Sequence, residues 1–120
     1  MVIKIVEVNS NKIAVVNSDE PIITDGQSAL DFAVNIGCEH NCHNLAVNKG
    51  AVAEDFFRLS TGVAGEVVQK LVNYEYRLAI IGDFSGYTSK PLRDFIYESN
   101  NGKHIYFVAN VDEAVRKLGA

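Results

Sequence analysis

Short apolar runs that alternate with helical patterns limit this chain to few folds. The first run is Val2–Val8, and a second, β-branched run covers Lys12–Asn17 after turn-prone residues at 9–11. Two such runs joined by a short turn are typical of a β-hairpin. From residue 24 onward, each further apolar run is separated from the next by a segment with helical periodicity. The sequence therefore predicts an N-terminal hairpin followed by strand–helix units.

Three later apolar runs are predicted to be strands, at residues 45–47, 76–81 and 104–109. The run at 76–81 is apolar apart from Arg77, which is typical of a central strand buried on both faces. Strands joined through helices run parallel, with right-handed crossovers. We therefore expect a single α/β domain over residues 1–120. Its one mixed sheet of about five strands is accompanied by four helices, in the order ββαβαβαβα.

The first helix is predicted over residues 25–36. Thr24 and Gln27 have the spacing of a capping box, and Gly37 is a typical residue for ending a helix. The residues expected to face the core recur at intervals of three and four: Leu30, Ala33, Val34 and Gly37.

Three more helices are predicted further along the chain. One begins at Thr61, and another covers residues 89–100 with Ser89 as its N-cap. The last follows Asn110, which opens a second capping-box pattern. Its predicted inner stripe contains Val111, Ala114, Val115 and Leu118.

Composition and charge exclude several classes of protein. The 120 residues are 48% hydrophobic and 22% charged, which is ordinary for a globular domain. The net charge of −4 and the lack of a basic run argue against nucleic-acid binding. No apolar run approaches the roughly 20 residues of a membrane-spanning helix, and no signal peptide is recognised. We expect a cytoplasmic protein of bacterial type, with neither nucleic acid nor membrane as a partner.

One short segment carries residues that can ligate metals: Cys38, His40, Cys42 and His43. Thiolates and imidazoles suit zinc or copper. Structural zinc sites usually pair two such segments, however, and His104 is the only other histidine. We therefore predict no metal site and no cofactor, and we expect Cys42 to be tucked inward as a small apolar residue.

Two links between a strand and a helix, at residues 55–65 and 82–89, gather glycine, hydroxyl, aromatic and acidic residues. The carboxyl ends of parallel strands meet at one edge of a sheet, and the N–H groups at a helix start can bind an anion. We expect both links to form one ligand-binding edge, flanked by Arg58 and Lys90. The residues assigned to it are Phe57, Thr61, Gly62, Asp83, Ser85, Tyr87, Thr88 and Ser89.

These residues also have a plainer interpretation, in which Thr61 and Ser89 only cap helices and the glycines only make turns. Asp83 decides the class of ligand. If its carboxylate is turned into its own loop towards Ser85, the edge suits an anion. If it faces the crevice, a cation or a hydroxyl-bearing ligand fits better.

A helical turn is predicted at residues 53–59, around the adjacent pair Phe56 and Phe57. Adjacent side chains cannot both point to the same core face of a regular element. We therefore expect one of the two rings to pack inward and the other to line a pocket or a partner surface.

Three stretches carry a resemblance to a known family: residues 54–70 (EDFFRLSTGVAGEVVQK), 73–74 (NY) and 82–98 (GDFSGYTSKPLRDFIYE). They resemble a bacterial family called domain of unknown function 4180. The similarity covers nearly the whole chain. It implies little about activity, because the family has no established one.

Residues 80–89, with Leu92, resemble the strand–Asp–apolar–Ser–helix passage of sulfate-transporter/anti-sigma-antagonist (STAS) domains. The order of elements is also similar to that of small anti-sigma antagonists and their lipid-transfer-like relatives. The resemblance implies a STAS-like fold, in which a hydroxyl at the helix start is phosphorylated in some members. In this chain the link is shorter and lacks an Asp-Ser-Ser-Gly-Leu string, so phosphorylation of Thr88 or Ser89 stays open.

We interpret the chain as a binding or regulatory module rather than an enzyme. It would engage a small anionic ligand or a partner protein at the edge formed by residues 55–65 and 82–89. The alternative is a small enzyme, or a lipid- or ligand-transfer-like protein, working at the same edge. A reactive pair facing a deep apolar pocket would favour the alternative, and a shallow edge would favour binding. The sequence assigns no catalytic residue and leaves a homodimer open.

Overall fold

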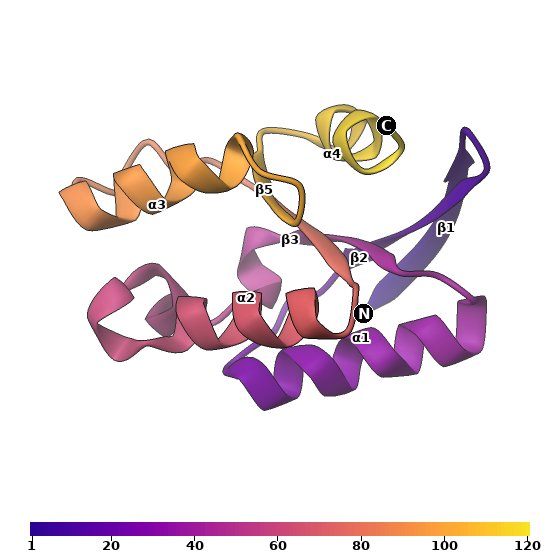
Figure 1. Ribbon diagram of the computed structural model, residues 1–120, viewed down its shortest axis with the longest axis horizontal. Helices are drawn as coiled ribbons and strands as arrows, with labels where there is room; N and C mark the ends of the chain where they lie inside the picture. Colours follow the sequence, from indigo (N-terminus) through magenta and orange to yellow (C-terminus); the bar gives the residue numbers. More distant parts are fainter.

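A computed structural model describes all residues 1–120 and contains one five-stranded sheet in the order β1-β2-β3-β4-β5 (Figure 1). The first two strands pair antiparallel as a hairpin, and the remaining pairs are parallel. The predicted mixed α/β sheet with an N-terminal hairpin is confirmed. The strands are β1 (Val2–Val8), β2 (Asn11–Asn17), β3 (Asn44–Asn48), β4 (Arg77–Ile81) and β5 (Ile105–Val108).

Four α-helices accompany the sheet: α1 (Gly26–His40), α2 (Val63–Asn73), α3 (Lys90–Asn100) and α4 (Val111–Leu118). The link from β3 to α2 holds three short 3₁₀ turns: η1 (Lys49–Ala51), η2 (Glu54–Phe57) and η3 (Leu59–Thr61). No helix combines the length and the apolar character that crossing a membrane requires.

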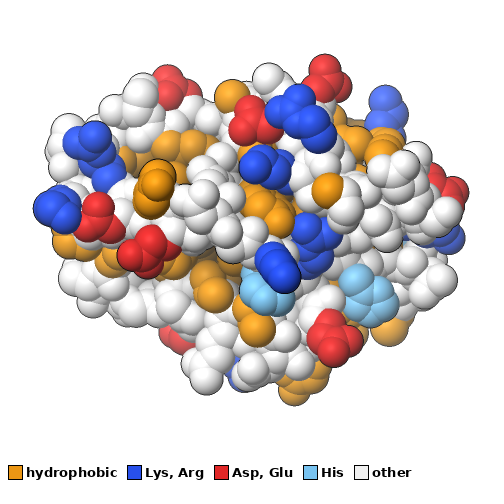
Figure 2. Space-filling view, turned by 45° about the horizontal axis from the view of Figure 1, so that its top comes forward, with side chains coloured by type: hydrophobic (Ala, Val, Ile, Leu, Met, Phe, Trp, Pro, Cys, Tyr) orange, Lys and Arg blue, Asp and Glu red, His pale blue; other side chains and the backbone are white.

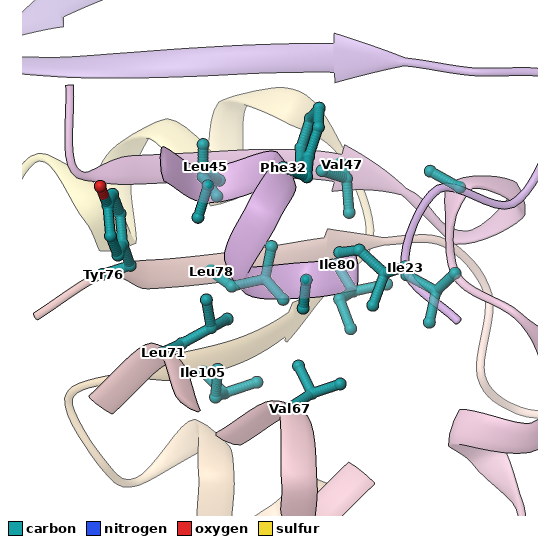
Figure 3. Packing of buried hydrophobic residues seen from close by; sticks show 14 of the residues in the cluster. Ile23, Phe32, Leu45, Val47, Val67, Leu71, Tyr76, Leu78, Ile80 and Ile105 are labelled. Atoms are coloured by element: carbon teal, nitrogen blue, oxygen red, sulfur yellow. The ribbon is translucent and has the colours of Figure 1, made fainter. Parts of the chain in front are cut away.

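Successive side chains along each strand point to opposite faces of the sheet, so the core forms two layers. Leu78 and Ile80 of β4 belong to the larger apolar cluster, which the side chains of α1, α2 and α3 complete (Figure 3). Ala79 points to the opposite face, where it joins Ala46 beneath α4. In Figure 1, α4 lies on the other side of the strands from α1 and α2. Small side chains at these two positions let the backbone of α4 approach the sheet closely.

Helix α1 does not end at Gly37, as the sequence predicts, but continues to His40. Asn41 adopts the left-handed conformation, with φ of 52°, and takes the terminating role expected of the glycine. Gly37 instead makes room for a neighbour, because a Cβ there would lie 2.7 Å from the hydroxyl oxygen of Tyr76. Close packing, and not helix termination, requires glycine at this position.

The start of α1 also differs from the prediction by one residue. Asp25 is the N-cap, its carboxylate accepts the amide of Ser28 at 2.7 Å, and the Ser28 hydroxyl accepts the amide of Asp25 at 3.0 Å. This reciprocal pair replaces the predicted box at Thr24 and Gln27. Hydrogen bonds from Ser28 lower the pKa of Asp25 and keep the cap ionised.

Two residues predicted to face the core are exposed. Val34 of α1 is 37% accessible and Val111 of α4 is 43% accessible. The buried stripe of α1 is rotated from the predicted one and contains Ala29, Leu30, Phe32, Ala33 and Ile36. Val111 occupies the first position of its helix, ahead of the buried Ala114 and Leu118.

Gly37→Ala is expected to destabilise the protein, although alanine favours a helix over glycine by about 1 kcal/mol. The new methyl group meets the Tyr76 hydroxyl, so we expect a net loss of about 1–2 kcal/mol in the free energy of unfolding. Urea denaturation measures the change. Gly65→Ala in α2 is the matched control, because no atom lies within 4 Å of the added Cβ and stability should rise.

Tyr76→Phe removes the hydroxyl that meets the added methyl group. In that background, Gly37→Ala should cost less than it does in the wild-type protein, which a double-mutant cycle measures. A stabilising effect of Gly37→Ala in the wild-type background would contradict the proposed close approach.

Candidate functional site

The two links predicted to form one edge do leave the sheet side by side. Strands β3 and β4 are parallel neighbours, and Asn48 pairs with Ile81 at their carboxyl ends. The chain therefore enters η1 and the loop 82–89 from adjacent positions. The amino ends of α1, α2 and α3 lie at this same end of the sheet (Figure 1).

Aromatic side chains join the two links. The ring of Phe57 stacks on Tyr87, with centroids 5.1 Å apart and planes inclined by 16°, and lies 5.9 Å from Phe84. Phe56 turns towards Phe95 and Phe107 of the core. Contrary to the prediction, both phenylalanines are buried, since the loop 82–89 folds over the ring expected to line a pocket.

Lys49 lies at the centre of this edge, and no sequence pattern indicated it. Its ammonium nitrogen lies 4.9 Å from the ring centre of Tyr87 and 5.5 Å from that of Phe57. The Tyr87 hydroxyl donates to Glu54 Oε1 at 2.9 Å. Interaction with the Tyr87 hydroxyl, and then the charges of Glu54 and Asp83, raise the pKa of Lys49. The lysine therefore acts here as a fixed cation and not as a base.

Asp83 takes the first of the two predicted positions, turned into its own loop. Its carboxylate accepts the amide of Ser85 at 2.9 Å, which makes an Asx-turn. Hydrogen bonding from Ser85, followed by the charge of Lys49, lowers the pKa of Asp83. This carboxylate therefore orders its own loop.

Three of the predicted site residues serve the local backbone. Thr61 donates its hydroxyl to the carbonyls of Asp55 and Arg58, at 2.7 and 2.8 Å. Gly62 adopts φ of 80°, which favours glycine, and begins α2. Ser89 accepts the amide of Leu92 as the N-cap of α3. The plainer interpretation of these residues as caps and turns accounts for the contacts that they make.

A shallow groove lies between the loop 82–89 and the outer face of α3. It measures about 520 Å³, and we call it the α3 groove. Thr88 and Ser85 are exposed on its loop side. Its lining comprises Phe84, Ser85, Tyr87, Thr88, Arg93, Ile96, Tyr97 and Asn100. Four of these are predicted site residues or their loop neighbours, whereas the contribution of α3 was not predicted.

The thiol segment forms no cluster of donors. Cys42 is 1% exposed, and its thiol lies 3.1 Å from the carbonyls of Lys12 and Asn44, as expected of an inward-facing residue. Cys38 is exposed on α1, and His43 stacks on Tyr76. No group of three His, Cys, Asp or Glu side chains in the structure is arranged to hold a metal ion.

Gly82→Ala is expected to disturb this edge. The added Cβ would lie 2.8 Å from Cβ of Lys49, an atom tied closely to the backbone. We expect a loss of about 1–3 kcal/mol in the free energy of unfolding, measured in urea. Gly86→Ala, four residues along the same loop, has no atom within 4 Å and should change stability by less than about 0.5 kcal/mol. Equal effects of the two substitutions would contradict the packing described.

The edge should also make stability sensitive to alkali. Burial raises the pKa of Tyr87, while Lys49 acts in the opposite direction, and the pKa of Lys49 is raised as well. A raised pKa means that the folded state holds the proton more tightly, so the stabilisation is complete below about pH 10 and is lost as pH rises further. Tyr87→Phe should reduce the slope of unfolding free energy against pH in this range. An unchanged slope would contradict the assignment.

Comparisons with known proteins identify a family and no activity. A family model described as a domain of unknown function (DUF4180) matches residues 8–118. Searches of curated proteins and of solved structures gave no match. The likeness to STAS domains therefore stays a prediction from the sequence. Because the family model spans almost the whole chain, from the end of β1 to the end of α4, this protein belongs to the DUF4180 family.

Proposed function

We propose that this protein is a small bacterial cytoplasmic binding module that engages an acidic segment of a partner protein at one part of the predicted edge, where loop 82–89 lies beside α3. The partner segment would lie in the α3 groove. The observation that carries the proposal is the composition of this groove, in which an exposed aromatic and an exposed cationic side chain lie beside exposed hydroxyls.

The exposed side chains of the α3 groove are of the kinds that dominate protein interfaces. Tyr97 is 72% exposed, the largest exposure among the large apolar residues, and it stands one helical turn after Arg93. Tyrosine and arginine are enriched among the residues that contribute most to binding energy. Phe84 and Ile96 add half-buried apolar surface between them.

Charge favours an acidic partner. Lys90 is paired with Asp94 at 2.7 Å, and Arg58 with Asp55 at 3.1 Å. Arg93 makes no ion pair, so its guanidinium is free for a carboxylate from outside. No Asp or Glu lines the groove, so no negatively charged lining side chain would repel the carboxylate of a docking segment.

The same lining favours binding over catalysis. The α3 groove offers two aliphatic hydroxyls, two phenols, an amide and a guanidinium, but no carboxylate, imidazole or thiol to serve as a general base. The groove is also open and shallow, whereas small-molecule enzymes usually enclose most of their substrate.

The partner can be identified by native mass spectrometry of the protein isolated from its own host. Once it is known, Tyr97→Ala should weaken binding at least tenfold, because truncating a tyrosine that dominates an interface costs about 2 kcal/mol or more. Arg93→Ala should weaken it as well, mainly at low salt.

Tyr74→Ala is the matched control, since Tyr74 is also an exposed tyrosine, at 56%, but lies at the end of α2 away from the groove. It should leave affinity unchanged. The proposed function would be overturned if both single variants, Tyr97→Ala and Arg93→Ala, bound the partner with wild-type affinity.

A further inference from the structure

A second hollow lies at the opposite edge of the sheet and is lined by basic residues. We call it the basic hollow, and its volume is about 940 Å³. It is bounded by the start of β4, the residues before β5 and the end of α4. Its lining comprises Val72, Glu75, Arg77, Asn100, Gly102, Lys103, His104, Tyr106, Arg116, Lys117 and Ala120. Figure 2 shows Lys and Arg side chains gathered near the centre of the view, beside a histidine.

The concentration of positive charge is unusual for this chain. Four of its 11 Lys and Arg residues line the basic hollow, against one of its 15 Asp and Glu residues, although the whole protein has a net charge of −4. None of the four makes an ion pair, because the structure's ion pairs involve Arg58, Lys90 and His40. The hollow is therefore a cationic region on an acidic protein.

Arg77 is the fixed cation of the hollow. Its guanidinium and Nε donate to the carbonyls of Lys103, Leu118 and Lys117, at 2.9, 3.1 and 3.3 Å. It also donates to the hydroxyl of Tyr106 at 3.1 Å. These bonds tie the end of α4 to the residues before β5, so Arg77 builds the floor while its charge stays without a carboxylate partner.

Helix dipoles account for only part of these cations. The carboxyl ends of α2, α3 and α4 meet at this edge, and each carries about half a negative charge. Together with Glu75 they amount to about −2.5, against four positive side chains. The partial charges of the helix ends, with Glu75, therefore do not neutralise the four cationic side chains.

The cations stand on two walls. Lys103 belongs to the segment before β5, whereas Arg116 and Lys117 belong to the last turn of α4. All three are exposed, and a ligand between the walls would meet charge from both sides. Arginine and lysine are the side chains that recognise phosphate groups.

We propose that the basic hollow binds a small phosphate-bearing ligand. The basic hollow shares only Asn100 with the α3 groove, and the proposal does not rest on the function proposed for that groove. Arg77 sets the positive potential, and Lys103 and Arg116 contact the phosphate oxygens from opposite walls.

The test is a titration with pyrophosphate, followed through backbone amide shifts by NMR. We expect saturable shifts at residues 102–106 and 116–118, with a dissociation constant below about 1 mM, and no such shifts with sodium chloride at the same ionic strength. Lys103→Ala combined with Arg116→Ala should weaken binding at least tenfold. Both side chains are exposed and make no hydrogen bond, so the fold should be retained.

Lys4→Ala combined with Lys12→Ala is the matched control. Both lysines are exposed on the N-terminal hairpin, make no ion pair and line neither the basic hollow nor the α3 groove, so their removal should leave pyrophosphate binding unchanged. Equal weakening by both pairs would show non-specific attraction and overturn the proposal. It would also be overturned if pyrophosphate caused no saturable shift, or if only an acidic peptide bound to the hollow. None of these outcomes bears on Tyr97 and the α3 groove, so the two proposals fail separately.

Discussion

The candidate edge depends on the parallel pairing of β3 with β4. Because Asn48 and Ile81 are register partners, Lys49 and Gly82 leave the sheet side by side. The missing side chain of Gly82 lets the stem of Lys49 pass where a Cβ would come within 2.8 Å of it. The lysine ammonium then reaches the rings of Phe57 and Tyr87, which come from different links. The pairing of β3 with β4 and the lack of a side chain at Gly82 thus bring Lys49, Phe57 and Tyr87 together on one surface.

Caps and apolar periodicity in the sequence predicted most of the fold, because these short-range features determine where helices and strands begin and end. The N-cap Ser89 defines the start of α3, and the short apolar run at 76–81 can be buried on both faces only as an inner strand. Gly37 shows where this reasoning stops. Its sequence context indicates a helix end, but the approach of Tyr76, which lies between α2 and β4, decides its role. Contacts between distant segments leave no periodic trace in the sequence.

Only the part of the candidate site that depends on short-range sequence features was predictable. Glycines and hydroxyls in two links after parallel strands indicated that these links lie side by side, and the spacing of Asp83 and Ser85 indicated the turn that forms there. Lys49 was missed because a single lysine after a strand carries no signal of its own. The α3 side of the groove was missed because Arg93 and Tyr97 look like the ordinary solvent face of an amphipathic helix. Only the loop 82–89, folded beside that face, turns it into a groove.

Strand β4 links the two proposed sites. Arg77, its first residue, forms the floor of the basic hollow, and the loop that follows Ile81 forms one wall of the α3 groove. Coupling between two ligands requires an element with two arrangements. The three residues in the middle of β4 are fully buried between helices on both faces, and both neighbouring strands are paired with it. Such a strand fixes positions at both of its ends, so the two sites share a scaffold rather than a switch.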